Sequence, residues 1–205
     1  NNLKSVIIGL SGTSLSKDEI ELLKDIKPFG FILFSRNIVS IHQLKKLIKD
    51  IRNLVKWECP ILIDQEGGRV QRLVKPNALS YPPSRLFGNI AKYNLRDAEK
   101  AVFLNYKLIG SDLINIGINV NCAPCIDVTS KLTHSVIGDR AFSSDAKIVA
   151  RLGQQACKGL LNLGVIPIIK HIPGHGRATS DSHKVLPIIK DKIYSLNNKD
   201  FYPFK

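Results

Sequence analysis

Three of the five histidines in this 205-residue chain stand close together, at His171, His175 and His183. The glycines and prolines between them mark a loop, and a histidine on a loop has no core to fill. Asp181 precedes His183 by two residues, so its carboxylate can accept a hydrogen bond from the imidazole within one turn. That contact fixes the tautomer and leaves the other ring nitrogen as an acid or base near neutral pH. The spacing therefore predicts a proton-transfer pair.

The same loop also offers metal ligands. The three histidines and Asp181 provide the nitrogen and oxygen donors that transition metals bind. The H-x-x-x-H spacing of His171 and His175 spans a Pro-Gly turn, whereas metalloprotease ligands with this spacing share one face of a helix. A metal-dependent hydrolase that uses His171, His175 and His183 stays open as an alternative.

Two further groups of polar residues could contribute to a binding site. Asp64 and Glu66 follow an apolar run, and the paired glycines after them allow a tight turn and close approach of a ligand. Carboxylates in this place can hold sugar hydroxyls or act as a base, or they can begin a helix, whose macrodipole favours acidic residues. Arg140 follows a Gly-Asp pair, and an isolated arginine is more often part of a surface ion pair.

Cys122 and Cys125 have the C-x-x-C spacing of a redox pair or of half a zinc site. Residues 126–128 continue as an extended segment, where a redox pair would open a helix, and no second C-x-x-C completes a zinc site. Four cysteines in a chain without a signal peptide at its start are typical of a reducing compartment. We therefore expect a cytoplasmic protein in which these cysteines are neither redox-active nor zinc-bound.

Alternating strands and helices are expected to position these groups. Apolar runs predict five strands, at 5–10, 31–34, 60–63, 118–127 and 165–170. Capping boxes at Ser16 and Ser40 predict the starts of two helices. A proline-rich loop is expected at 76–88, and two longer helices are expected at 97–115 and 144–164. Polar clusters follow the third, fourth and fifth strands. Strands that are apolar throughout predict an α/β fold with a parallel sheet covered by helices on both faces, or a barrel.

The net charge of +13 would suit a nucleic acid, an anionic lipid or an acidic substrate. The lysines are spread over helical faces, as at Lys45, Lys46 and Lys49, and no nucleic-acid-binding motif accompanies them. No apolar run approaches the roughly 20 residues that span a bilayer. We expect a lysine-rich solvated surface, with neither nucleic acid nor membrane as a partner.

Four stretches together carry a family resemblance: LIDQEGGRVQRL at 62–73, APCIDV at 123–128, IGDRAF at 137–142 and KHIPGHGRATSDSHKVLP at 170–187. The most specific is the last, with KH-x-PGHG followed by D-S-H. The chain resembles the bacterial β-N-acetylglucosaminidases of glycoside hydrolase family 3, in their single-domain, cytoplasmic form that recycles the cell wall. The resemblance extends over nearly the whole chain in order.

The resemblance implies a TIM (β/α)8 barrel and a retaining enzyme without metal or cofactor. Its carbohydrate substrates would be N-acetylglucosaminyl-anhydromuramyl peptides, from which it removes the terminal β-linked N-acetylglucosamine. His183 and Asp181 would be the catalytic acid/base pair. Asp64 would hold ring hydroxyls, and the basic residues would donate to hydroxyls and to the acetamido group. The implied sugar-binding residues are Asp64, Arg72, Arg140, Lys170 and His171.

One part of the family pattern is absent. A retaining glycosidase needs a nucleophile about 5–5.5 Å from its acid/base group, and in this family it is an aspartate of an S-D-D segment after a sixth strand. After His183 the chain has only Asp191 and Asp200, in lysine-rich surroundings without a strand before them. We therefore expect one glycoside hydrolase domain over 1–205, incomplete at its C-terminal side after about five strands. The alternative function is an inactive, vestigial sugar-binding protein, and open sheet edges would favour self-association.

Overall fold

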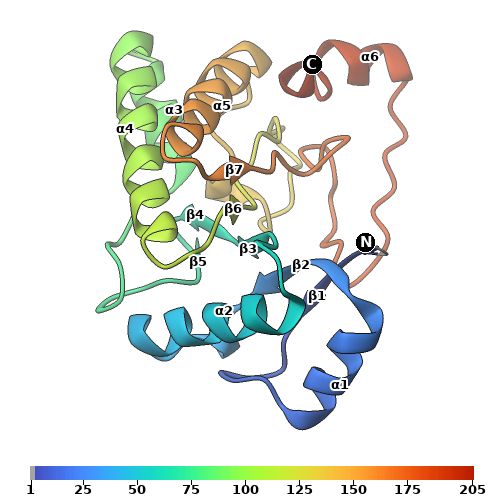
Figure 1. Cartoon of the computed structure of the whole chain (residues 1–205). Helices are drawn as coiled ribbons and strands as arrows, with labels where there is room; N and C mark the ends of the chain where they lie inside the picture. Colours follow the sequence, from blue (N-terminus) through green and yellow to red (C-terminus); the bar gives the residue numbers. More distant parts are fainter. Residues whose placement is uncertain (1–2) are drawn as a thin grey trace.

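The structure of the chain, a computed structural model, describes residues 3–205 (Figure 1). Five parallel strands form one sheet in the order β1-β2-β3-β6-β7. Their bounds are β1 Lys4–Gly9, β2 Pro28–Leu33, β3 Ile61–Ile63, β6 Val120–Asn121 and β7 Ile166–Pro167. Each new parallel strand is added beside the previous one, as in a TIM barrel. The predicted α/β class and the parallel sheet are confirmed.

Helices connect the strands. They are α1 Lys17–Ile26, α2 Ile41–Val55, α3 Ser84–Ala91, α4 Leu95–Ile114, α5 Ala146–Leu161 and α6 Ile193–Asn198, with 3-10 turns η1 Ser35–Asn37, η2 Gly138–Arg140 and η3 Tyr202–Phe204. The capping box of α1 is complete, since the Ser16 hydroxyl accepts from the Glu19 amide and the Glu19 carboxylate accepts from the Ser16 amide. Ser40 caps α2 through the Gln43 amide, but the Gln43 side chain accepts from the Val39 amide instead. In the part of the chain described, no helix has the length and apolar character needed to cross a bilayer.

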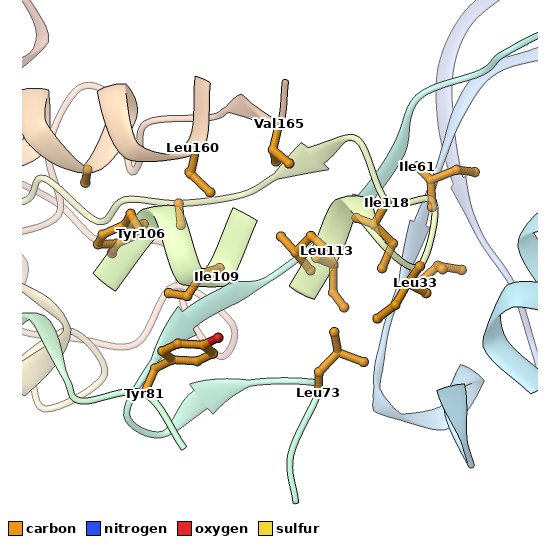
Figure 2. Close-up of a cluster of buried hydrophobic side chains, with 14 of the residues drawn as sticks. Leu33, Ile61, Leu73, Tyr81, Tyr106, Ile109, Leu113, Ile118, Leu160 and Val165 are labelled. Atoms are coloured by element: carbon orange, nitrogen blue, oxygen red, sulfur yellow. The ribbon is translucent and has the colours of Figure 1, made fainter. Parts of the chain in front are cut away.

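The hydrophobic core lies between the sheet and its helices (Figure 2). One face of α4 supplies three side chains with no exposure to solvent, namely Tyr106, Ile109 and Leu113. Full burial of a large apolar side chain contributes about 1.5–3 kcal/mol to stability. α4 also packs closely against α5 at Gly159, where a Cβ atom would lie 2.6 Å from the carbonyl oxygen of Phe103. The pair of helices fixes the sheet behind β6 and β7.

Two elements differ from the sequence prediction. β4, Gln65–Gly67, and β5, Val70–Gln71, form a short antiparallel hairpin. Gly67 and Gly68 reverse the chain there with φ angles of 98° and 58°, a conformation that glycine adopts at little cost. α3 occupies the end of the predicted loop 76–88, because proline is compatible with the start of a helix and disrupts only its interior.

The fourth and fifth predicted strands are shorter than expected. The segments 118–127 and 165–170 pair as strands over only two residues each. Pro124 has no amide hydrogen to donate to a ladder. Beyond it a single bridge joins Cys125 to Lys170, with the Ile126 amide donating to the Lys170 carbonyl at 2.8 Å. That bridge carries the two segments side by side into the polar region described below.

Candidate active site

Charged side chains meet at the carboxyl ends of β3 and β7. Asp64 directly follows β3, and Lys170 lies three residues beyond β7. The Lys170 ammonium lies 2.8 Å from Oδ1 of Asp64 and 2.6 Å from Oε1 of Glu66. Nη2 of Arg72 lies 3.1 Å from the other oxygen of Asp64. Each oxygen of Asp64 is therefore held by a cation, one of them 8 and the other 106 residues further along the chain.

Arg140 joins the same group from the turn η2. Its Nε and Nη2 atoms donate to the two oxygens of Glu66 at 2.9 and 2.8 Å, a bidentate pair. Arg69 holds this turn in place, because its guanidinium bonds Asp139 and the carbonyl groups of residues 135–137. Glu66 is only 2% exposed. It therefore positions Arg140 and Lys170 from beneath and does not face solvent.

The pKa values in this group follow from burial and pairing. Burial alone would raise the pKa of Asp64, but the charges of Lys170 and Arg72 bring it below its ordinary value. Burial would lower the pKa of Lys170, and Glu66 and Asp64 raise it above its ordinary value. For Arg140 the bidentate contact with Glu66 likewise outweighs burial and raises the pKa. All these groups are ionised at neutral pH.

Asp127 orients His171. Its Oδ2 atom lies 2.6 Å from Nδ1 of His171, and its Oδ1 atom accepts from the amides of His171 and His175. Nη2 of Arg140 lies 3.1 Å from the other ring nitrogen of His171. Arginine can only donate, so Nε2 must be an acceptor and the proton must stand on Nδ1. The single lone pair of Nε2 is then taken by Arg140, so a hydroxyl could bind Nε2 only as a donor that displaces Arg140, which reverses the polarity expected from the sequence.

Exposure separates side chains that can touch a ligand from those that support them. The His171 and Arg72 side chains are 35% and 29% exposed, and Asp64 is 16% exposed. Glu66 and Asp127 are almost or fully buried. Glu66 was expected, with Asp64, to hold sugar hydroxyls, to act as a base or to begin a helix, whereas no role was predicted for Asp127. For Asp127 a signal existed, since it ends the predicted strand 118–127 much as Asp64 follows the third strand.

The predicted contact between Asp181 and His183 forms, outside the hydrogen-bond network of the charged group. Nδ1 of His183 lies 2.7 Å from Oδ1 of Asp181, which also accepts from the His183 amide. The amide and the ring of His183 lower the pKa of Asp181. The His183 side chain is 78% exposed, and within residues 3–205 no hydrogen bond or ion pair joins it to Asp64, Arg140 or His171. The pair lies on the long irregular segment that follows β7 (Figure 1).

The two aspartates after His183 are bound to Arg177. Its Nη1 atom lies 2.6 Å from Asp191, and its Nε atom lies 2.6 Å from Asp200. Asp200 is buried, at 3% exposure. Both carboxylates therefore anchor the segment that carries His183.

Comparison with known proteins gives the family. Residues 2–205 match the glycosyl hydrolase family 3 N-terminal domain. A β-hexosaminidase of Hydrogenovibrio crunogenus is 34% identical over 202 residues, which are 98% of this chain and 56% of the relative. The chain belongs to glycosyl hydrolase family 3.

Solved structures of family 3 proteins agree with this assignment. Native NagZ from Neisseria gonorrhoeae matches with a TM-score of 0.91 and 34% identity, over 97% of this chain and 58% of that one. The same protein was also solved in complex with N-trifluoroacetyl-D-glucosamine, and it matches there with the same TM-score. The chain thus spans between 56% and 58% of the length of these relatives.

The structure does not gather the three loop histidines into one metal site. Among residues 3–205, the group of side chains placed to share an ion is Cys125, Asp127 and His171. The Cys125 thiol and Nδ1 of His171 both form hydrogen bonds with Oδ2 of Asp127, and burial raises the pKa of the thiol. His175 is not in this group, and its ring centroid lies 6.1 Å from that of His171. All four cysteines are free, so Cys122 and Cys125 form no disulfide.

Because Asp127 is ionised in the folded state, the free energy of unfolding of this family 3 domain should fall as the pH is lowered. Burial would raise its pKa, but the contact with His171 lowers it below its ordinary value. Its stabilising contribution is therefore complete above the unfolded-state pKa of about 3.9, and it is lost as the pH falls through the lower folded-state pKa. Urea unfolding between about pH 3 and 6 should show a shallower acid loss of stability in Asp127→Asn than in the parent. The exposed-site variant Asp18→Asn serves as the control, and equal slopes for parent and Asp127→Asn would contradict this account.

Proposed function

We propose that this family 3 domain carries the sugar-binding site and the acid/base pair of a β-N-acetylglucosaminidase. The observation that carries the proposal is the charged group at the carboxyl ends of β3 and β7, in which Asp64 is fixed by Lys170 and Arg72. Fixed charges of both signs form charge-assisted hydrogen bonds with neutral hydroxyls. The β-hexosaminidase relative and the NagZ complex with a glucosamine derivative support the same ligand class.

The side chains of the group take separate roles in this proposal. Asp64 accepts hydrogen bonds from ring hydroxyls, and Arg72 donates to the sugar. His171 accepts a sugar hydroxyl at Nε2 in place of Arg140, and the released Nη2 of Arg140 donates to the acetamido group or to a hydroxyl. Lys170 donates to a hydroxyl and holds Asp64 in place. Each role uses the protonation state that the contacts impose.

His183 is proposed as the general acid and base, and Asp181 as its orienting partner. The carboxylate fixes the ring with the proton on Nδ1 and stabilises the imidazolium that forms when Nε2 takes up a proton. His183 is exposed and bonds no member of the charged group, so in this proposal its segment closes over bound sugar and brings Nε2 to the glycosidic oxygen. The substrate class proposed is the N-acetylglucosaminyl-anhydromuramyl peptides of the recycled cell wall, in the cytoplasm, with retention of configuration.

Binding and hydrolysis test this proposal separately. The 205-residue chain should bind N-acetylglucosamine, and Asp64→Ala should weaken binding about tenfold or more, because hydrogen bonds to charged groups contribute about 1.5–3 kcal/mol. Isothermal titration calorimetry measures both, with Asp18→Ala on the exposed start of α1 as the matched control. No binding by the parent chain, or equal binding by Asp64→Ala, would reject the assigned site.

Hydrolysis of an aryl β-N-acetylglucosaminide by the same chain should be near zero. Retention needs a carboxylate nucleophile close to the acid, and Asp191 and Asp200 are held by Arg177. Clear turnover would show that a nucleophile lies among residues 1–205. Turnover abolished by chelation would instead favour the metal-dependent hydrolase. Binding without turnover in any longer form of the protein would favour the vestigial sugar-binding protein.

A further inference from the structure

A cavity lies at the opposite end of the sheet from the charged group. Its volume is about 720 Å³, within the range of small-molecule sites. It forms where α1 and α2 end and their chains turn into β2 and β3, so it stands at the amino ends of the strands. It is lined by Leu3, Leu23, Lys24, Lys27, Leu54, Val55, Lys56 and Trp57. The lining is therefore apolar side chains together with three lysines.

The lysines of this cavity have no acidic partners. Within residues 3–205, no ion pair joins Lys24, Lys27 or Lys56 to a carboxylate. Glu58, which follows Trp57 in the chain, does not line the cavity and is paired with Arg52. The cavity thus combines apolar side chains with three lysines that form no ion pair with a carboxylate in the described part of the chain.

Two of the lysines adopt an unusual backbone conformation. Among residues 3–205, the non-glycine residues with positive φ are Lys27, at 50°, and Lys56, at 64°. Each ends a helix, α1 or α2, in the left-handed conformation that usually selects glycine. α4 and α5 are followed by glycine in that conformation, at Gly117 and Gly164. Lysine therefore stands at the two helix ends that line the cavity, and glycine at two that do not.

The favourable interaction of lysine with a helix macrodipole does not explain why Lys27 and Lys56 adopt the left-handed conformation. A lysine in the last turn of a helix complements the macrodipole from any ordinary conformation, as Lys158 does at the end of α5. A side chain in the left-handed region is strained, and strain of this kind often marks a functional position. What Lys27 and Lys56 share is that both line this cavity.

We propose that this cavity binds a free amphiphilic anion, an alkyl carboxylate whose chain lies against Leu23, Leu54 and Trp57 and whose head group is held by Lys27 and Lys56. The aliphatic lining excludes a wholly polar anion, because such a ligand would leave the apolar surface unfilled. The three exposed lysines, which have no acidic partner among residues 3–205, favour an anionic head group over a neutral or cationic one by charge complementarity. The site is separate from the sugar-binding group and does not depend on the function proposed above.

Trp57 provides the test, because it is the only tryptophan in the chain. Dodecanoate, added below its micelle concentration, should change Trp57 fluorescence in a saturable way. Dodecan-1-ol lacks the charge, and butanoate lacks the chain, so each should bind about tenfold more weakly or not at all. Equal responses to dodecanoate and dodecan-1-ol would overturn the role of the lysines. A response only to phosphatidylglycerol vesicles would overturn the free anion in favour of a membrane surface.

A double variant separates binding from folding. Lys27→Gly with Lys56→Gly removes both charges and relieves the left-handed strain, so the melting temperature should not fall while dodecanoate affinity falls about tenfold or more. Lys45→Ala with Lys49→Ala removes the same charge from α2 outside the cavity, and its affinity should match the parent. Parental affinity in the glycine variant would overturn the proposal. So would an equal loss of affinity in the alanine variant, because it would show that only the net charge of +13 attracts the anion.

Discussion

Replacing Glu66 by alanine should lower the free energy of unfolding by about 3–5 kcal/mol, since the change leaves the buried guanidinium of Arg140 without its carboxylate partner and Lys170 with Asp64 alone. Arg140 and Lys170 both bond Glu66, and their side chains are only 10% and 14% exposed. Neither can turn to water without moving the turn η2 or the end of β7. A domain with a total stability of about 5–15 kcal/mol would lose a large share of it.

The size of that effect separates a buried ion pair from a surface one. Asp50→Ala breaks the pair with Lys46 on α2, where the side chains are 37% and 70% exposed, and should cost about 1 kcal/mol or less. Glu66→Ala combined with Arg140→Met should cost less than the two single changes added together, because it removes a charge as well as its partner. Urea unfolding of the four variants measures the loss of unfolding free energy in each. A cost for Glu66→Ala no greater than that for Asp50→Ala would refute the supporting role of Glu66.

Local signals in the sequence predicted the fold as far as contacts between near neighbours decide it. The Ser16 capping box joins residues three apart, and it forms with both of its hydrogen bonds. The parallel order of the strands follows from apolar runs separated by helices. The β4–β5 hairpin was missed because its strands are too short to show a periodic pattern. Its glycine pair was correctly expected to form a turn.

In the candidate site, too, the contact between near neighbours in the sequence was predicted and the contacts between distant residues were not. The Asp181–His183 contact was predicted from a spacing of two residues and is present. The support of Arg140 by Glu66 and of His171 by Asp127 was not predicted, because these contacts join residues 74 and 44 positions apart. Sequence spacing shows which groups could titrate. Only the fold shows which carboxylates lie beneath the site and which face a ligand.

In a polypeptide that joins residues 1–205 to the remaining C-terminal part of the Neisseria gonorrhoeae NagZ, His183→Ala should lower kcat roughly 10²–10⁴-fold, the usual range for general acid–base catalysis. Departure of the sugar's leaving group requires a proton, and water must later lose one, so one imidazole serves both steps near neutral pH. Asp181→Asn should lower kcat as well, because the ring then loses the carboxylate that fixes its tautomer. On the 205-residue chain itself, 15N NMR should show that the neutral His183 ring carries its proton on Nδ1. In Asp181→Asn the ring should lose this preference for the Nδ1 tautomer.

The kinetic pattern distinguishes proton transfer from sugar binding. Within residues 3–205 no hydrogen bond or ion pair joins His183 to the proposed sugar-binding residues, so its removal should change kcat and leave KM nearly unchanged. Asp64→Ala should mainly raise KM, because its hydrogen bonds form with the ground-state sugar as well as with the transition state. An activated aryl glycoside needs less protonation of its leaving group, so His183→Ala should slow its cleavage less than that of a natural disaccharide. If His183→Ala were as active as its parent on both substrates, the exposed Asp181–His183 pair would have no part in bond cleavage. The acid would then have to be sought among the groups that surround Asp64.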